Sequence, residues 1–171
     1  MADVDSTMEH LTTTDPISFV RAIEELPAGV LVYQGPDHVV IGANRAARSF
    51  LADRPGILGL PLREMWPEGV GQNVIGRLDH VYATGEQFSG SEWRIEVDGH
   101  SDGGERFVDL TVVRLTGPEG TVSGVACQFA DVTARVRARR ALEVDAADLR
   151  ERYEAAQDVV LTLQRSLLPD G

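Results

Sequence analysis

An apolar stripe near the C-terminus constrains this chain more than any other feature. Between residues 134 and 168 the sequence contains no glycine or proline, and apolar side chains recur every seven residues, with a second series offset by four. This spacing places both series on one side of an α-helix. The stripe consists of Leu142, Ala146, Leu149, Tyr153, Ala156, Val160, Leu163 and Leu167.

The length of this helix decides how the stripe can be covered. A helix of about 35 residues would be roughly 50 Å long, more than a small domain can cover along one line. A second helix must shield the apolar side chains, and another copy of the same chain is its simplest source. The sequence therefore predicts a parallel homodimeric coiled coil over residues 134–168. The alternative is a helix that folds back onto its own domain.

The charge of the chain disfavours several classes of partner. Its 171 residues include 16 basic and 27 acidic side chains, which give a net charge of −11. Such an acidic protein repels phosphate backbones and anionic lipids, so we expect no nucleic-acid partner and no membrane. Apolar runs fall short of the ~20 residues of a membrane span, and the N-terminus lacks a signal-peptide pattern. We therefore expect a cytoplasmic protein.

The residues before the stripe predict two groups of strands separated by short helices. Asp15 and Asn44 are suited to cap helices, Gly85 is suited to end one, and turn-rich segments separate the strands. The predicted helices cover residues 16–26, 45–52 and 74–85, and the predicted strands cover residues 29–33, 38–41, 87–97, 105–115 and 121–130. This order predicts an α+β fold, with helices on one face of a five-stranded antiparallel sheet. Residues 1–14 are expected to be disordered.

Four short sequences occur in an order and spacing typical of one family. They are Leu-Pro-Ala-Gly-Val-Leu-Val at 26–32, Ala-Asn-Arg-Ala-Ala at 43–47, Gly-Leu-Pro-Leu at 59–62, and the segment from Gly124 to Asp-Val-Thr at 131–133. Through them, residues 19–133 resemble a PAS domain, a small sensor fold with a five-stranded antiparallel sheet. The resemblance implies a sensor domain over residues 15–133, including its flanking helix. It also makes Asp131 and Thr133 the junction between the last strand and the output helix.

The resemblance implies a cavity between the sheet and the helices, where PAS domains often hold a small ligand. The side chains expected to line it are Leu31, Tyr33, Ile41, Phe50, Leu78, Val108, Leu110, Val112, Cys127 and Phe129. The alternative is a core that side chains fill completely, with no ligand. Neither the sequence nor the resemblance identifies the input signal.

Two cofactors of the family are disfavoured by the residues present. Flavin-binding members carry a cysteine in an Asn-Cys-Arg-like helix motif and a glutamine two positions before the final aspartate. Here Cys127 lies on a predicted strand, and Phe129 occupies the glutamine position. Haem-binding members use a histidine on the long central helix, but His80 lies off the apolar face of that helix. No cofactor is therefore predicted.

A metal site is not predicted either. The single cysteine excludes an internal disulfide and a multi-cysteine zinc site. His10, His38 and His100 are expected in a tail, at a strand edge and in a loop, without ligand spacing. The loop at residues 98–104 lacks the oxygen pattern of a calcium loop and is interpreted as a flexible hairpin connection.

A second resemblance lies at the C-terminal end. Leu-Gln-Arg-Ser-Leu-Leu-Pro at 163–169 resembles the segment that leads into SpoIIE-type bacterial serine phosphatases, metal-dependent enzymes of the PPM class that act in sigma-factor regulation. The resemblance implies that residues 169–171 begin an effector domain, and that manganese or magnesium would bind only there. No nucleophile–base motif or phosphate loop is found, so this chain is not expected to be an enzyme. The alternatives are a sensor segment of a histidine kinase or cyclase, and a ligand-free dimerisation scaffold.

Overall fold

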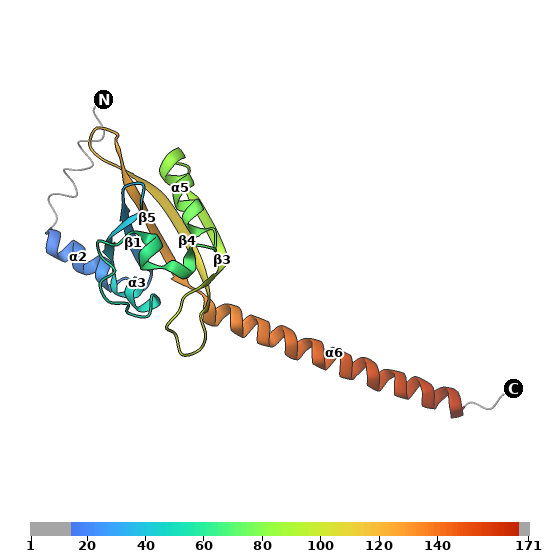
Figure 1. Cartoon of the computed structure of the whole chain (residues 1–171). Coiled ribbons are helices and arrows are strands. Elements are labelled where there is room, and N and C mark those ends of the chain that lie inside the picture. The colour runs from blue at the N-terminus through green and yellow to red at the C-terminus, as the bar shows by residue number, and fades with distance from the viewer. Residues whose placement is uncertain (1–14, 168–171) are drawn as a thin grey trace. The chain divides into compact units, whose positions relative to one another are not determined.

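A computed structural model describes residues 15–167, with side chains through residue 165 (Figure 1). The expectations for residues 1–14 and 169–171 lie outside the described residues. The chain divides into two compact units, of which the first ends at Val132 and the second begins at Thr133. Within the described residues, no helix combines the length and the apolarity that a membrane span requires.

Five antiparallel strands form the sheet of the first unit. They are β1 (Gly29–Gln34), β2 (Val39–Ala43), β3 (Phe88–Glu96), β4 (Glu105–Thr116) and β5 (Val122–Asp131). Their order in space is β2-β1-β5-β4-β3, so the last strand in sequence lies at the centre of the sheet. Cys127 of β5 pairs with Leu31 on one side and with Val112 on the other. The predicted α+β fold with a five-stranded antiparallel sheet is confirmed.

Short helices cover one face of this sheet. The helices of the first unit are α2 (Pro16–Glu25), α3 (Arg45–Phe50), α4 (Leu62–Met65), the 3₁₀ turn η1 (Pro67–Gly69) and α5 (Val74–Thr84). Helices α3 and α5 lie over the sheet in Figure 1, and the core forms beneath them. Ile75, Leu78 and Val81 are the buried residues of α5, at the i, i+3, i+6 spacing of one helix face.

The helix ends follow local chemistry. The Asp15 carboxylate accepts a hydrogen bond from the amide of Ile17 at 3.1 Å, and so caps α2 as predicted. Gly85 ends α5 in the left-handed conformation, with φ 78°. The helix predicted over residues 45–52 is shorter than expected. It ends at Phe50 because Ala52 and Asp53 adopt positive φ angles of 56° and 50°, which no helix accommodates.

The second unit is one continuous helix. Helix α6 (Thr133–Leu167) contains 35 residues and no glycine or proline. Its described side chains are exposed from residue 137 onward, including those of the apolar stripe. The side chain of Leu167, the last predicted stripe residue, lies outside the described residues. The long C-terminal helix is confirmed, and its pairing with a second copy stays a prediction.

Candidate functional site

An apolar cavity of about 60 Å³ lies between the sheet and the helices. Strands β1, β3, β4 and β5 supply the sheet side of its wall, and helices α3 and α5 supply much of the other side. Its lining residues are Leu31, Tyr33, Phe50, Leu51, Met65, Trp66, Val74, Leu78, Ile95, Val97, Val108, Leu110, Val112, Cys127 and Phe129. The cavity is large enough for a few water-sized molecules.

Nine of the ten residues expected to line a cavity come together here. They are Leu31, Tyr33, Phe50, Leu78, Val108, Leu110, Val112, Cys127 and Phe129. Sequence reasoning missed Met65 and Trp66, because residues 53–72 show no clear period. It also missed Leu51, Val74, Ile95 and Val97. That a ligand occupies this cavity remains a prediction.

The prediction for Ile41 was wrong. Ile41 is 52% exposed, whereas its neighbour Val40 is fully buried. Side chains alternate between the two faces of a strand, so the face of Ile41 depends on the exact register of β2. The pairing passes from Val32–Gly42 directly to Tyr33–Val40, so Ile41 is an extra, unpaired residue of β2, and this irregularity leaves no signal in the sequence. Ile41 instead lines a groove on the outer face of the sheet, beside Phe19 and Val20 of α2.

Three polar groups belong to the cavity wall. The Trp66 indole N–H donates a hydrogen bond to the carbonyl of Glu96 at 3.0 Å. Burial raises the pKa of Cys127 to about 12. Burial also raises the pKa of Tyr33 well above its ordinary value, and the charge that Cys127 would carry raises it further. Both groups are therefore neutral at physiological pH, and Cys127 is a poor nucleophile.

A partly buried ion pair fastens the segment that carries Trp66. The guanidinium of Arg54 pairs with the carboxylate of Glu68, and it also donates to the carbonyl of Met65 at 3.0 Å. The Glu68 carboxylate accepts a further hydrogen bond from the amide of Asp98 at 3.0 Å. Gln72 adds two bonds to Glu96 at the end of β3, one donated to its carbonyl and one accepted from its amide. These contacts hold α4 and η1 against the sheet, over one side of the cavity.

Removing the charge of Glu68 should weaken this attachment. Burial raises the pKa of Glu68, but the hydrogen bonds from Arg54 and from the amide of Asp98 outweigh it and leave the pKa below its ordinary value of 4.5. The charged form thus stabilises the fold above pH 4.5, and this contribution is lost as the pH falls through the lower pKa. We expect Glu68→Gln to lower the free energy of unfolding by about 2 kcal/mol at pH 7.

Urea denaturation at several pH values checks this expectation. The difference between wild type and Glu68→Gln should shrink as the pH falls below 4.5. Glu25→Gln is the matched control, because the Glu25–Arg45 pair is 61% and 63% exposed and should contribute less than about 0.5 kcal/mol. Equal effects of the two substitutions would contradict the role assigned to Glu68.

Asn44 connects α2 to the rest of the first unit. The sequence predicted it only as a helix cap, and it does cap α3 by accepting from the amide of Ala47 at 3.0 Å. Its carboxamide oxygen also accepts from the amide of Val30 at 2.9 Å, and its nitrogen donates to the carbonyls of Ile23 and Ala28 at 3.0 and 2.8 Å. Both polar atoms of this buried side chain therefore have two partners each.

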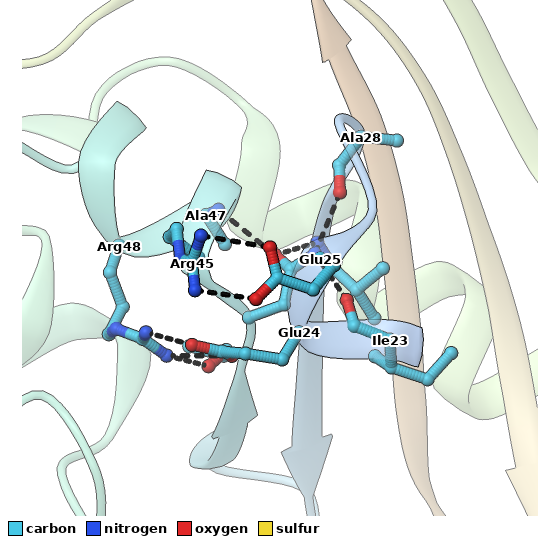
Figure 2. A network of polar contacts seen from close by, with 10 residues as sticks. Ile23, Glu24, Glu25, Ala28, Arg45, Ala47 and Arg48 are labelled. Carbon is cyan, nitrogen blue, oxygen red and sulfur yellow. Dashed lines mark hydrogen bonds and ion pairs between the residues drawn. The ribbon is translucent and has the colours of Figure 1, made fainter. Parts of the chain in front are cut away.

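Two ion pairs reinforce this attachment between α2 and α3. Glu25 pairs with Arg45, and Glu24 pairs with Arg48, as Figure 2 shows. The hydrogen bond from Arg48 lowers the pKa of Glu24. Helix α2 has no buried residue of its own, so polar contacts at its C-terminal end carry its attachment.

The structure changes the interpretation of one histidine. His38 was expected at a strand edge, but it is 2% exposed and its Nε2 lies 2.8 Å from a carboxylate oxygen of Asp79. Its Nδ1 has no hydrogen-bond partner among the described residues. His100 contacts the carbonyl of Phe50 at 2.8 Å, while His80 is exposed beside Glu86, as expected. In the described part of the chain, no cluster of three metal-ligating side chains occurs.

The predicted signal junction, Asp131 and Thr133, lies where the central strand β5 ends and α6 begins. Asp131 is the last residue of β5, where it pairs with Val108, and Thr133 is the first residue of α6. Cys127 and Phe129 of the same strand line the cavity. One strand therefore contacts the cavity and ends one residue before the long helix. The role of these two residues in signalling stays a prediction.

Comparisons with known proteins identify the fold. A family model described as PAS fold matches residues 23–137. The structure resembles the PAS domain of a protein from Colwellia psychrerythraea, with a TM-score of 0.55 and 15% identity, covering 70% of this chain and 99% of that one. It also resembles the PAS domain of BvgS from Bordetella pertussis, with a TM-score of 0.54 and 19% identity, covering 81% and 99%.

A third similar structure belongs to a larger protein. An RNA-binding light-oxygen-voltage receptor matches with a TM-score of 0.58 and 21% identity. The match covers 84% of this chain and 39% of the receptor chain. At such identities these likenesses concern the fold alone, and they assign no ligand or partner to this chain.

Proposed function

Since the chain belongs to the PAS family, we propose that it is a regulatory sensor that dimerises through α6 and transmits a change at its cavity along that helix. The observation that carries the proposal is the course of β5. This central strand lines the cavity with Cys127 and Phe129 and ends at Asp131, and one residue, Val132, separates it from α6. A ligand that shifts β5 would therefore act directly on the first turn of the helix.

The apolar stripe of α6 supports dimerisation. Leu142, Leu149, Tyr153, Val160 and Leu163 are all more than half exposed in the single chain. Burying apolar side chains stabilises an assembly by about 25 cal/mol for each Å² removed from water. A parallel partner helix would cover them in the heptad register. Ala146 and Ala156 are small members of the stripe and contribute little packing between the helices. Such positions allow the paired helices to pack in alternative ways, and a signal could switch between these packings.

One pair of substitutions tests the dimer. Leu149 lies on the stripe and is 68% exposed, while Val144 is 67% exposed and lies on the opposite side of α6. We expect Leu149→Glu to weaken dimerisation at least about 100-fold. The substitution replaces two leucines of the interface between the paired helices with two side chains of like charge. Val144→Glu should leave the dimer unchanged. Sedimentation equilibrium measures both, and equal effects, or a monomeric wild type, would contradict the proposal.

A ligand-free scaffold is the alternative function. In a sensor, binding of a ligand should change how the two α6 helices pack against each other. In a scaffold, this packing should not change. Disulfide cross-linking of Leu142→Cys and Ala156→Cys dimers, with and without ligand, distinguishes the two. Cross-linking rates that no cavity ligand alters would favour the scaffold.

An effector domain is proposed to follow α6. The resemblance at residues 163–169 supports a metal-dependent serine phosphatase that follows in a longer protein, with manganese or magnesium bound there. The next 50 or so codons of the gene would test this. A His-Glu pair flanked by apolar residues on a helix would instead indicate a histidine kinase.

A further inference from the structure

His38 connects the turn between β1 and β2 to helices α4 and α5. The residue has a left-handed φ of 51° and is 2% exposed. Its Nε2 lies 2.8 Å from a carboxylate oxygen of Asp79 on α5, and its backbone carbonyl accepts from the amide of Leu62 at 3.1 Å. The rings of Tyr33 and Tyr82 pack against it in edge-to-face geometry, with centroids 6.3 and 6.0 Å away. The imidazole therefore reaches water only if the turn or α5 moves.

The hydrogen bonds of this ring indicate its protonation state. A carboxylate accepts hydrogen bonds and donates none, so the proton of the neutral ring belongs on Nε2, which donates to Asp79. Nδ1 then carries a lone pair, and it has no hydrogen-bond partner among the described residues. The second proton of an imidazolium would bind to Nδ1. Protonation thus creates a buried donor on a charged ring, and the described residues supply no acceptor for it.

Two opposing effects act on that second proton. The negative charge of Asp79 attracts an imidazolium, but the Asp79 side chain is 50% exposed, and its other oxygen lies 4.0 Å from the guanidinium of Arg63. Water and a second cation therefore weaken the attraction. Tyr33 and Tyr82, the other titratable side chains packed against the ring, are phenols and bring no counter-charge. A buried charged donor without an acceptor costs more than a half-exposed ion pair contributes, so the fold favours the neutral ring.

We propose that protonation of His38 separates α5 from the turn between β1 and β2, and so loosens the wall of the cavity in acid. Leu78, the neighbour of Asp79 on α5, lines the cavity, and so does Tyr33, which packs against the imidazole. Histidine is the side chain whose charge changes in the physiological pH range. This device needs neither a ligand nor a dimer, so its test is independent of the proposed function.

Hydrogen exchange of the full chain at about pH 7.5 and about pH 5.5 tests the proposal, with each rate corrected for the intrinsic effect of pH. We expect the protection factors of residues 78–82 in α5 to fall about tenfold in acid, while those of residues 125–129 change less than about twofold. His38→Gln keeps a neutral donor to Asp79 and should abolish the fall. His80→Gln is the matched control, because His80 is 52% exposed on the same helix, and it should retain the fall.

Two further measurements distinguish a proton-sensitive contact from a merely structural one. Asp79→Asn removes the counter-charge of the imidazolium and should enlarge the fall, whereas loss of a structural contact would weaken protection equally at both pH values. Nitrogen chemical shifts should show the ring of His38 protonated on Nε2 alone at about pH 7.5.

Several results would overturn the proposal. They are a ring protonated on both nitrogens at about pH 7.5, protection of α5 that is unchanged or higher in acid, and a fall that Asp79→Asn does not enlarge. A fall that survives His38→Gln, or that disappears in His80→Gln, would assign the effect to another group. If circular dichroism shows that His38→Gln does not fold, Asp79→Asn and the ring shifts decide the question.

Discussion

Replacing Asn44 with alanine should destabilise the first unit by about 3–5 kcal/mol, a large part of the stability of a small domain. The substitution removes four hydrogen bonds at once and leaves the amides of Val30 and Ala47 and the carbonyls of Ile23 and Ala28 without this partner. The carbonyl of Ile23 belongs to α2, and that of Ala28 belongs to the connection between α2 and β1. Urea denaturation should show the loss directly, and α2 should lose protection from hydrogen exchange.

Two further variants separate the parts of this effect. Asn44→Asp keeps the oxygen that accepts from Val30 and Ala47, but it replaces the amide nitrogen that donates to Ile23 and Ala28. The amide of Ala47 should therefore stay protected while those of α2 exchange. Arg45→Ala removes only the exposed pair with Glu25 and should cost less than about 1 kcal/mol. An Asn44→Ala variant as stable as Arg45→Ala would show that the network does not attach α2.

Replacing Gly124 with alanine should be at least as damaging. A Cβ at this position would lie 1.9 Å from the carbonyl oxygen of Tyr33 on the adjacent strand, so β1 and β5 could not keep their spacing. We expect a loss of at least about 4 kcal/mol, which corresponds to a fall in Tm of about 15 °C or more. Thermal unfolding followed by circular dichroism measures the main effect.

Gly71→Ala is the matched control for this substitution. A Cβ at Gly71 would meet no atom within 4 Å, and the residue has no positive φ angle. The stability of the Gly71→Ala variant should therefore change by less than about 1 kcal/mol. It should increase if alanine lowers the conformational entropy of the unfolded chain. A small effect of Gly124→Ala would mean that the central strands can separate locally without loss of the fold.

The local predictions succeeded where a single residue type decides the conformation. Asp15, Asn44 and Gly85 begin or end helices as expected, because capping and left-handed backbone depend on the residue itself. The cavity was also largely predictable, since alternation along β4 and β5 gives one apolar face. Ile41 shows the limit of that reasoning. Ile41 is skipped in the pairing of β2 with β1, and simple alternation along the strand cannot predict such an irregularity.

The α+β order of elements, the long unbroken helix and its apolar stripe could be predicted without any tertiary contact. These depend on periodicity and on the placement of glycine and proline, which are local properties. Long-range contacts, by contrast, place β5 at the centre of the sheet, fasten α2 through Asn44 and bury His38 beside Asp79. Each of these brings together residues distant in sequence. Packing and hydrogen-bond geometry select such contacts, and no local pattern encodes them.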